Sequence, residues 1–234
     1  MTVITLILLV LFIALGRWQW GRAEFKQRLG AEFASGAGEI VALGSKTAVE
    51  LPRYAYVEVS GGWDDARQFL LDNRTRDGRA GYEVLTPLQL ENGRWLLVNR
   101  GWVPFEGYRE RLPDVGLSSS DGAVTIVGRL DELPTAGLAG GRAAPAISGG
   151  WPRVTAYPLP EELARSLGVD PERLESRVLL LDASEPEGYR RDWKPYAKGP
   201  EQNWSYAIQW WSFAVLLLVL FVVMNLKKEM RNDD

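Results

Sequence analysis

The sequence predicts a membrane protein of the α+β class, in which two terminal transmembrane helices flank one mostly antiparallel, barrel-like β domain with a short helix. Three observations predict this class. Apolar residues gather at both ends of the chain, although the mean hydropathy of the whole sequence is only −0.14. The middle carries short stretches in which apolar and polar residues alternate, as half-buried strands do. Turn residues separate these stretches, and the long crossovers of a βαβ fold are missing.

The apolar segment near the C-terminus is long enough to cross a membrane. Residues 204–225 are mostly apolar and begin with a cluster of aromatic side chains, and about 20 apolar residues span the hydrocarbon core. Basic residues follow the segment: Lys227, Lys228 and Arg231. Because lysine and arginine favour the cytoplasmic side, we expect a cytoplasmic tail at 226–234. Both termini are then cytoplasmic, and the central domain is periplasmic in a bacterial inner membrane.

The N-terminal apolar run is shorter. Thr2 to Leu15 spans the bilayer only if residues 16–20 lie in the interface, with Arg17 extending outward, so we expect a first transmembrane helix at 1–20. A start upstream of Met1 is one alternative. A cleaved signal peptide is another, but the basic n-region and the small-residue cleavage site of such a peptide are poorly represented here.

Residues 21–203 are expected to form the periplasmic domain. Asn92-Gly93 joins two apolar runs, which predicts a hairpin of 82–90 with 95–101. Residues 160–167 begin with proline and two glutamates and end before Gly168, which predicts a short helix. Residues 133–152 are rich in Gly, Ala and Pro, which indicates a flexible loop. The further expected strands are 54–60, 67–72, 124–131 and 177–183.

Composition excludes several classes of function. The formal charge is −3 and the middle has no basic run, so we expect no nucleic-acid partner. The chain contains no histidine and no cysteine, which removes thiolate chemistry, zinc sites and the commonest general base. Serines therefore lack a base, and no phosphate-binding loop follows a strand. We expect no catalytic residue and no metal site, and therefore not an enzyme.

The two helices carry semi-polar aromatic residues that suggest a groove. In the second helix, Asn203 and a stripe of aromatic and amide residues recur at helical spacing, and the first helix exits the membrane with further tryptophans. Packing between the two helices, with an interfacial aromatic belt, is one interpretation. A groove for a planar apolar ligand or a partner helix is the other. The candidate residues are Trp18, Gln19, Tyr206, Gln209, Trp210 and Phe213.

The end of the predicted hairpin carries a second candidate site. Arg100 precedes an exposed-looking turn that contains Trp102, and Arg74 leaves the preceding strand. Capping of strand ends and salt bridges explain such arginines in ordinary domains. If the two segments adjoin, the arginines could instead bind a partner or clamp a carboxylate.

The order of the motifs resembles the Surfeit-locus cytochrome c oxidase assembly factor family, whose yeast member is known as the Shy factor. The resemblance covers nearly the whole chain. It is carried by L-G-x-W-Q-x-x-R at Leu15–Arg22, by G-Y-E-V-L-T-P-L at Gly81–Leu88, by L-V-N-R-G-W-V-P at Leu97–Pro104, and by Y-A-I-Q-W at Tyr206–Trp210.

This resemblance implies an inner-membrane assembly factor for a haem-copper terminal oxidase. It would assist maturation or the insertion of haem a into the large subunit, with that subunit, other assembly factors and membrane lipid as partners. The alternative is a two-span structural or accessory subunit of a respiratory complex. One departure concerns haem a, since the histidine that many members carry three residues before the last motif is Asn203 here. Haem a is therefore expected only as a transient ligand, by resemblance, without histidine ligation.

Overall fold

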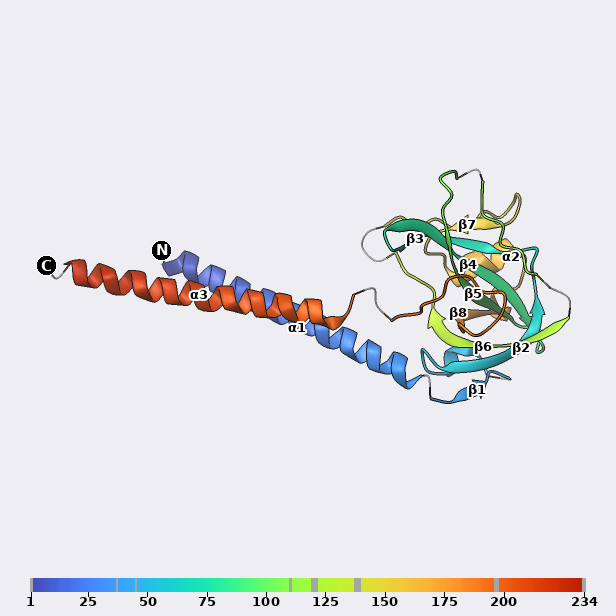
Figure 1. The fold of residues 1–234 in the computed structure, drawn as a ribbon, viewed down its shortest axis with the longest axis horizontal. Helices are drawn as coiled ribbons and strands as arrows, with labels where there is room; N and C mark the ends of the chain where they lie inside the picture. Colours follow the sequence, from blue (N-terminus) through green and yellow to red (C-terminus); the bar gives the residue numbers. More distant parts are fainter. Residues whose placement is uncertain are drawn as a thin grey trace. The chain divides into compact units, whose positions relative to one another are not determined.

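The computed structural model describes residues 2–36, 38–44, 46–109, 111–118, 122–136, 140–195 and 198–232. The chain divides into two compact units, which are considered separately. One is a helix pair, built from residues up to Glu32 and from Lys194 onward, and the other is a β domain, Phe33–Trp193. Figure 1 labels the elements of both units.

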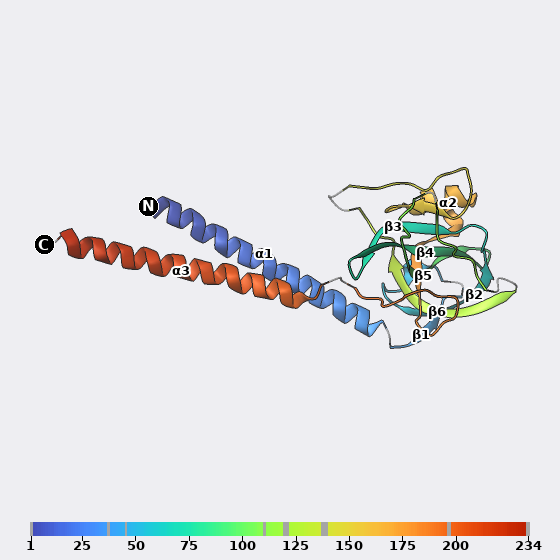
Figure 2. The same cartoon turned by 45° about the horizontal axis from the view of Figure 1, so that its top comes forward.

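The helix pair consists of α1 (Thr2–Ser35) and α3 (Pro200–Asn232). Both are long and apolar enough to cross a membrane. They run antiparallel, with both chain termini at the same end of the pair (Figure 2). The predicted membrane protein of the α+β class is confirmed.

Helix α1 does not end where its apolar run ends. Its 34 residues correspond to about 51 Å, well beyond the roughly 30 Å of a hydrocarbon core. The second half, from Gly21 onward, contains charged residues but no proline before Ser35, so nothing in it interrupts the helical hydrogen bonds. The compact β unit begins at Phe33, and the domain bounds predicted from the sequence, 21–203, stay a prediction.

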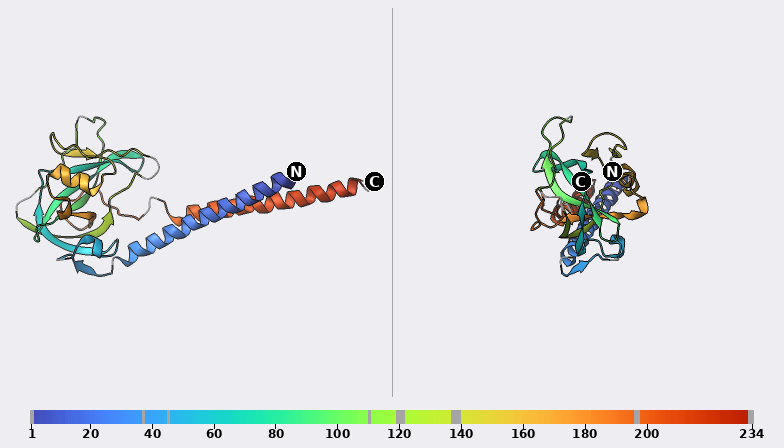
Figure 3. Two further views of the ribbon diagram at one scale, coloured as in Figure 1. Left: turned by 180° about the vertical axis from the view of Figure 1, so that it is seen from behind. Right: turned by 90° about the vertical axis from the view of Figure 1, so that its right-hand side faces the viewer.

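The β domain contains β1 (Ile40–Ala42), η1 (Ala48–Glu50), β2 (Tyr56–Trp63), β3 (Phe69–Arg76), β4 (Arg79–Leu90), β5 (Trp95–Pro104), β6 (Ala123–Glu132), β7 (Arg153–Thr155), α2 (Pro160–Leu167), η3 (Pro171–Arg173) and β8 (Leu174–Leu181). The strand order is β1-β2-β6-β8-β5-β4-β3-β7, and β2 also pairs with β4. This extra pairing closes the ring β2–β6–β8–β5–β4 into a barrel, with β2 and β6 side by side along one wall (Figures 1 and 3). The barrel-like expectation is confirmed.

Glycine allows the barrel to close. Gly61 of β2 pairs with Leu90 of β4, and a Cβ at Gly61 would lie only 2.3 Å from the carbonyl oxygen of Gln89. Gly128 of β6 lies equally close to β8, where a Cβ would come within 2.5 Å of the Leu180 oxygen. At both places a side chain would push neighbouring backbones apart. Leucines and valines such as Leu88, Val98 and Leu179 fill the interior and are fully buried.

The predicted hairpin and short helix are confirmed. β4 and β5 pair antiparallel, and in the turn between them Leu90 N donates to the Arg94 oxygen and Gly93 N donates to the Leu90 oxygen. α2 begins at Pro160, and its last turn is closed by Gly168 in the left-handed conformation. Its apolar face, including Leu163, packs into the core beneath β3, β4 and β8.

Two short strands and three parallel pairings were not expected. β1 pairs parallel with β2, β7 with β3, and β5 with β8. β1 and β7 have three residues each, too few for an alternating pattern to show. The loop expected at 133–152 includes residues 137–139, which lie outside the described residues. Within the rest, Ala143 bridges to Ala156, and the carbonyl oxygens of Ala146 and Gly149 accept hydrogen bonds from Arg153.

Candidate functional site

The two long helices pack along one seam with a repeat of three and four residues. On α3 the less exposed positions follow this repeat: Asn203, Ala207, Trp210, Ala214, Leu217 and Phe221. On α1, Phe12, Gly16, Gln19, Ala23 and Lys26 occupy the matching positions. A seam of this kind joins helices that cross at a shallow angle. Small residues let the backbones approach: a Cβ at Gly16 would lie within 2.2 Å of the Trp211 indole.

Asn203 lies in a polar network within this seam. Lys26 Nζ donates to Asn203 Oδ1 at 2.7 Å, and Asn203 Nδ2 donates to Gln19 Oε1 at 2.7 Å. Both ends of the Asn203 amide are therefore engaged. The network places a lysine and two amides where the helix pair leaves its apolar section. Gln19 is thus a residue that links the helices.

An aromatic cluster lies one to two turns further into the apolar section. Phe12 of α1 contacts Trp210 at 5.8 Å and Phe213 at 6.0 Å between ring centroids. Trp210 and Phe213 also meet edge to face at 5.9 Å. Such pairs stabilise the helix contact beyond the area that they bury. The three rings thus contact one another, while Phe213 remains 40% exposed.

The remaining candidates of the helix pair do not join this seam. Tyr206 is 44% exposed and Trp18 is 58% exposed, and Gln209 is also exposed. A step of three residues rotates by about 300° around a helix, so positions spaced by three drift off one face. The predicted stripe therefore divides: Asn203 and Trp210 face α1, whereas Gln209 does not. The predicted ligand groove remains a proposal.

In the β domain, Arg100 is buried with 1% of its surface exposed. Its guanidinium donates to the carbonyl oxygens of Glu187 at 2.6 Å and Val115 at 2.8 Å, and to Gln68 Oε1 at 3.1 Å. Burial lowers the pKa of Arg100, and the nearby Tyr189 and Glu187 oppose this shift. Arg100 therefore fastens the segments around Val115 and Glu187 to the barrel, and in this conformation its guanidinium is out of reach of a partner.

Trp102 is 7% exposed, so the turn that looked exposed in the sequence is buried. The reason is the pairing of β5: Trp102 bridges to Arg190, and its indole Nε1 donates to the carbonyl oxygen of Arg74 at 2.9 Å. This bond shows that the two segments adjoin, which the sequence had left open.

The guanidinium of Arg74, unlike that of Arg100, has N–H groups without a hydrogen-bond acceptor among the described residues. Its Nε lies 3.7 Å from Glu83 Oε2, and its guanidinium lies 5.6 Å from the centre of the Tyr157 ring. Neither Nε nor Nη2 has a hydrogen-bond partner within the described part of the chain. The neighbouring Arg76 lies on the same side of β3 and pairs with Asp192. Both arginines are half-buried, and Arg74 is the one whose guanidinium keeps N–H groups without a hydrogen-bond acceptor among the described residues.

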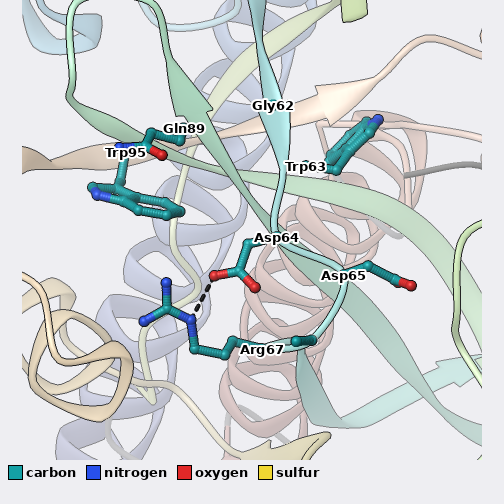
Figure 4. Close-up of a pocket in the computed structure, with 8 residues that line it drawn as sticks. Gly62, Trp63, Asp64, Asp65, Arg67, Gln89 and Trp95 are labelled. Carbon is teal, nitrogen blue, oxygen red and sulfur yellow. Dashed lines mark hydrogen bonds and ion pairs between the residues drawn. The ribbon is translucent and has the colours of Figure 1, made fainter. Parts of the chain in front are cut away.

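Sequence reasoning missed a cleft of about 590 Å³ at the rim of the barrel, where β2 ends (Figure 4). Arg67 donates to Asp64 at 2.5 Å and lies 5.3 Å from the centre of the Trp95 ring. Gly62 and Gln89 complete the wall between them. No local pattern signals this cleft, because its residues come from two strand ends that meet only when the barrel closes.

Among the described residues, no group of three or more His, Cys, Asp or Glu side chains could hold a metal ion. The geometry thus defines a membrane protein that carries a closed β-barrel domain between two packed helices. A sequence model of the SURF1 family matches residues 6–215, which include most of α1, the whole domain and about the first half of α3. The chain belongs to the SURF1 family.

One curated relative is a SURF1-like protein of Dictyostelium discoideum. It is 33% identical over 104 residues, which make up 40% of this chain and 38% of the relative. The match thus spans less than half the length of that relative.

Proposed function

We propose that this chain is an assembly factor for a haem-copper terminal oxidase, acting in maturation of the large subunit or in insertion of haem a. The SURF1 family is known as a family of cytochrome oxidase assembly factors, and the family match over residues 6–215 carries the proposal. The architecture supports it, because two helices are long and apolar enough to place the chain in a membrane, as this function requires. Its site is then the surface of the helix pair and the domain face around Arg74.

We propose the bacterial inner membrane as its location, with both termini cytoplasmic and the domain periplasmic. The antiparallel helix pair, which has both termini at one end, supports this topology. The basic residues that follow the apolar part of α3 set its direction. Alkaline-phosphatase fusions at Gly141 should be active, and stably inserted but inactive fusions would contradict the topology.

If the chain binds haem a, it binds the haem only transiently, before the haem is passed to the oxidase. The residues present do not fit a resident haem held by imidazole or thiolate, because the chain has no histidine or cysteine. The amide at Asn203 is already bonded at both ends. Any contact with haem a would have to come from apolar packing against the exposed flank of Tyr206 and the cluster of Trp210 and Phe213. Trp18 would lie at the mouth of such a groove.

On the domain, we propose that Arg74 contacts the partner, while Arg100 and Trp102 act indirectly by holding the strands and loops that present it. The Nε and Nη2 atoms of Arg74 form the edge of the guanidinium that suits a carboxylate; they have no hydrogen-bond partner among the described residues but are covered in this conformation, so a partner could bind them only after the neighbouring side chains move. This division predicts different phenotypes for variants of Arg74 and of Arg100.

The decisive experiment is deletion followed by complementation. Membranes of the deletion strain should show less oxidase activity and a weaker haem a absorption band, and the intact chain should restore both. Normal oxidase in the deletion strain would refute the proposal. Recovery of the chain in equal amounts with the purified, mature oxidase would instead support the alternative, a structural or accessory subunit.

A further inference from the structure

The cleft at the rim of the barrel contains a row of three residues from neighbouring strands. Gly62 of β2 pairs with Gln89 of β4, and Gln89 pairs with Trp95 of β5. Residues paired across strands point to the same face of a sheet. Leu88 and Leu90, on either side of Gln89, belong to the interior of the barrel, so the row faces outward. Gly62 leaves a gap in the row, because a Cβ there would meet nothing within 4 Å beyond its chain neighbours.

Arg67 closes the base of this cleft, and its charge is already matched. It donates to Asp64 at 2.5 Å and to the carbonyl oxygen of Leu167 at the end of α2, and its guanidinium lies over the Trp95 ring. A cationic ligand would therefore find the cation position on this indole taken by Arg67. An anionic ligand would meet two carboxylates, Asp64 and Asp65, against one guanidinium. The charges that line the cleft thus favour a neutral ligand.

Several hydrogen-bonding groups of the cleft have no partner in the described part of the chain. They are the side-chain amide of Gln89, one oxygen of Asp64 and Nη2 of Arg67. Figure 4 shows Gln89 and Trp95 on one side of the space, with the pair of Asp64 and Arg67 at its base. The amide donates and accepts, the carboxylate accepts and the guanidinium donates. A ligand that satisfies all of them needs several polar groups, and it needs an apolar face to lie against the indole.

We propose that this cleft binds a neutral saccharide, with a pyranose ring against the Trp95 indole and its hydroxyls bonded to Gln89 and Asp64. Each hydroxyl of a sugar both donates and accepts, and the C–H face of a pyranose is apolar. One neutral ligand therefore meets both requirements of the cleft. Its volume of about 590 Å³ lies within the range of sites for small molecules.

An extended peptide, the other neutral ligand with donors and acceptors, fits this cleft less well. Peptides that bind a sheet usually add a strand to a free edge. Gly62 is paired with Gln89 on one side and with Ala123 on the other. The strands that line the cleft therefore offer no free edge here, and recognition depends on side chains alone.

The binding test uses the full chain in a detergent without a sugar headgroup, because a maltoside detergent would itself compete for the site. Saturation-transfer NMR with maltotriose, cellotriose and chitotriose should show saturable binding of at least one of them, with a Kd of about 1 mM or lower. Triglycine, a neutral peptide, and glucuronate, an anion, should not bind. Absence of binding by all three saccharides at about 10 mM, ten times that Kd, would overturn the proposal. Equal or tighter binding of triglycine or glucuronate would overturn it as well.

Two variants test the location of the site. Gly62→Leu fills the gap in the row and should abolish binding. Gly150→Leu is the matched control, because a Cβ at this glycine also meets nothing within 4 Å and Gly150 lies outside the cleft. Neither glycine has a left-handed backbone, so both variants should keep the circular dichroism spectrum of the wild type. Gln89→Ala should weaken binding about threefold to tenfold, as loss of one hydrogen bond does.

Wild-type affinity in Gly62→Leu, or equal loss of binding in Gly150→Leu, would show that the saccharide binds elsewhere and would overturn the assignment of the cleft. These measurements require no oxidase, so a failure here leaves the proposed assembly function to its own test.

Discussion

Removing the Arg100 side chain should destabilise the β domain strongly. The guanidinium holds three acceptors at 2.6–3.1 Å and is only 1% exposed. In Arg100→Ala the Glu187 oxygen loses its donor, whereas the Val115 oxygen keeps a bond from Gln68 and Gln68 Oε1 keeps a bond from Thr86. One unsatisfied buried group costs about 1–3 kcal/mol. For a chain of this size that corresponds to a fall in Tm of about 2–12 °C.

The assay is thermal unfolding of the full chain in detergent, followed by near-ultraviolet circular dichroism, which reports tryptophan packing. Arg109→Ala is the matched control, because Arg109 pairs with Asp72 at the surface and is 69% exposed. It should leave Tm unchanged. Arg100→Lys keeps the charge but cannot reach all three acceptors, so its Tm should lie between wild type and Arg100→Ala. A fall below about 2 °C for Arg100→Ala would refute the assignment of Arg100 as a structural residue.

Three further variants test other parts of the molecule. Gly16→Ala places a Cβ against the indole of Trp211 and should loosen the helix pair, measured as increased protease access to α1. Gly61→Ala pushes β2 from β4 and should lower Tm by several degrees in the same circular dichroism assay. Burial and a hydrogen bond to Asp182 raise the pKa of Tyr56 to about 12. The folded state thus favours the neutral phenol, and its stabilisation is complete below about pH 10 and lost as pH rises toward 12. Tyr56→Phe should lack this alkaline loss of stability in pH-dependent unfolding, and an unchanged profile would contradict the coupling.

The sequence predicted the elements whose information is local. Asn92-Gly93 specifies a tight turn between two apolar runs, and Gly168 ends a helix, because few other residues accept these backbone conformations. The apolar ends identify the membrane segments by length alone. Closure of the barrel could not be predicted in this way. The pairing of Gly61 with Leu90 joins two strands that are not consecutive in the sequence, and the residue pattern of neither strand identifies the other as its partner.

The candidate site, like the fold, could be predicted from the sequence only in part. The sequence left open whether the segments of Arg74 and Trp102 adjoin, and the bond between them shows that they do. The sequence could not show that the Arg100 side chain points inward. An arginine next to a glycine is expected to be exposed unless buried hydrogen-bond acceptors for its guanidinium are known. Those acceptors include backbone oxygens of Val115 and Glu187, which any residue type supplies. Gln68 at 4% exposure was missed for this reason.

This burial changes what a loss of oxidase activity would mean. A variant of Arg100 that lowers activity does not identify a partner contact, because a destabilised domain loses activity as well. Arg74→Ala separates the two explanations: the Nε and Nη2 atoms of Arg74 have no hydrogen-bond partner to lose, and its contact with Glu83 is loose at 3.7 Å. If Arg74 contacts the partner, Arg74→Ala should reduce oxidase maturation in complemented membranes while Tm falls by less than about 2 °C. Full activity with an unchanged Tm would remove Arg74 from the partner surface, and a large fall in Tm would place Arg74 beside Arg100 as a structural residue.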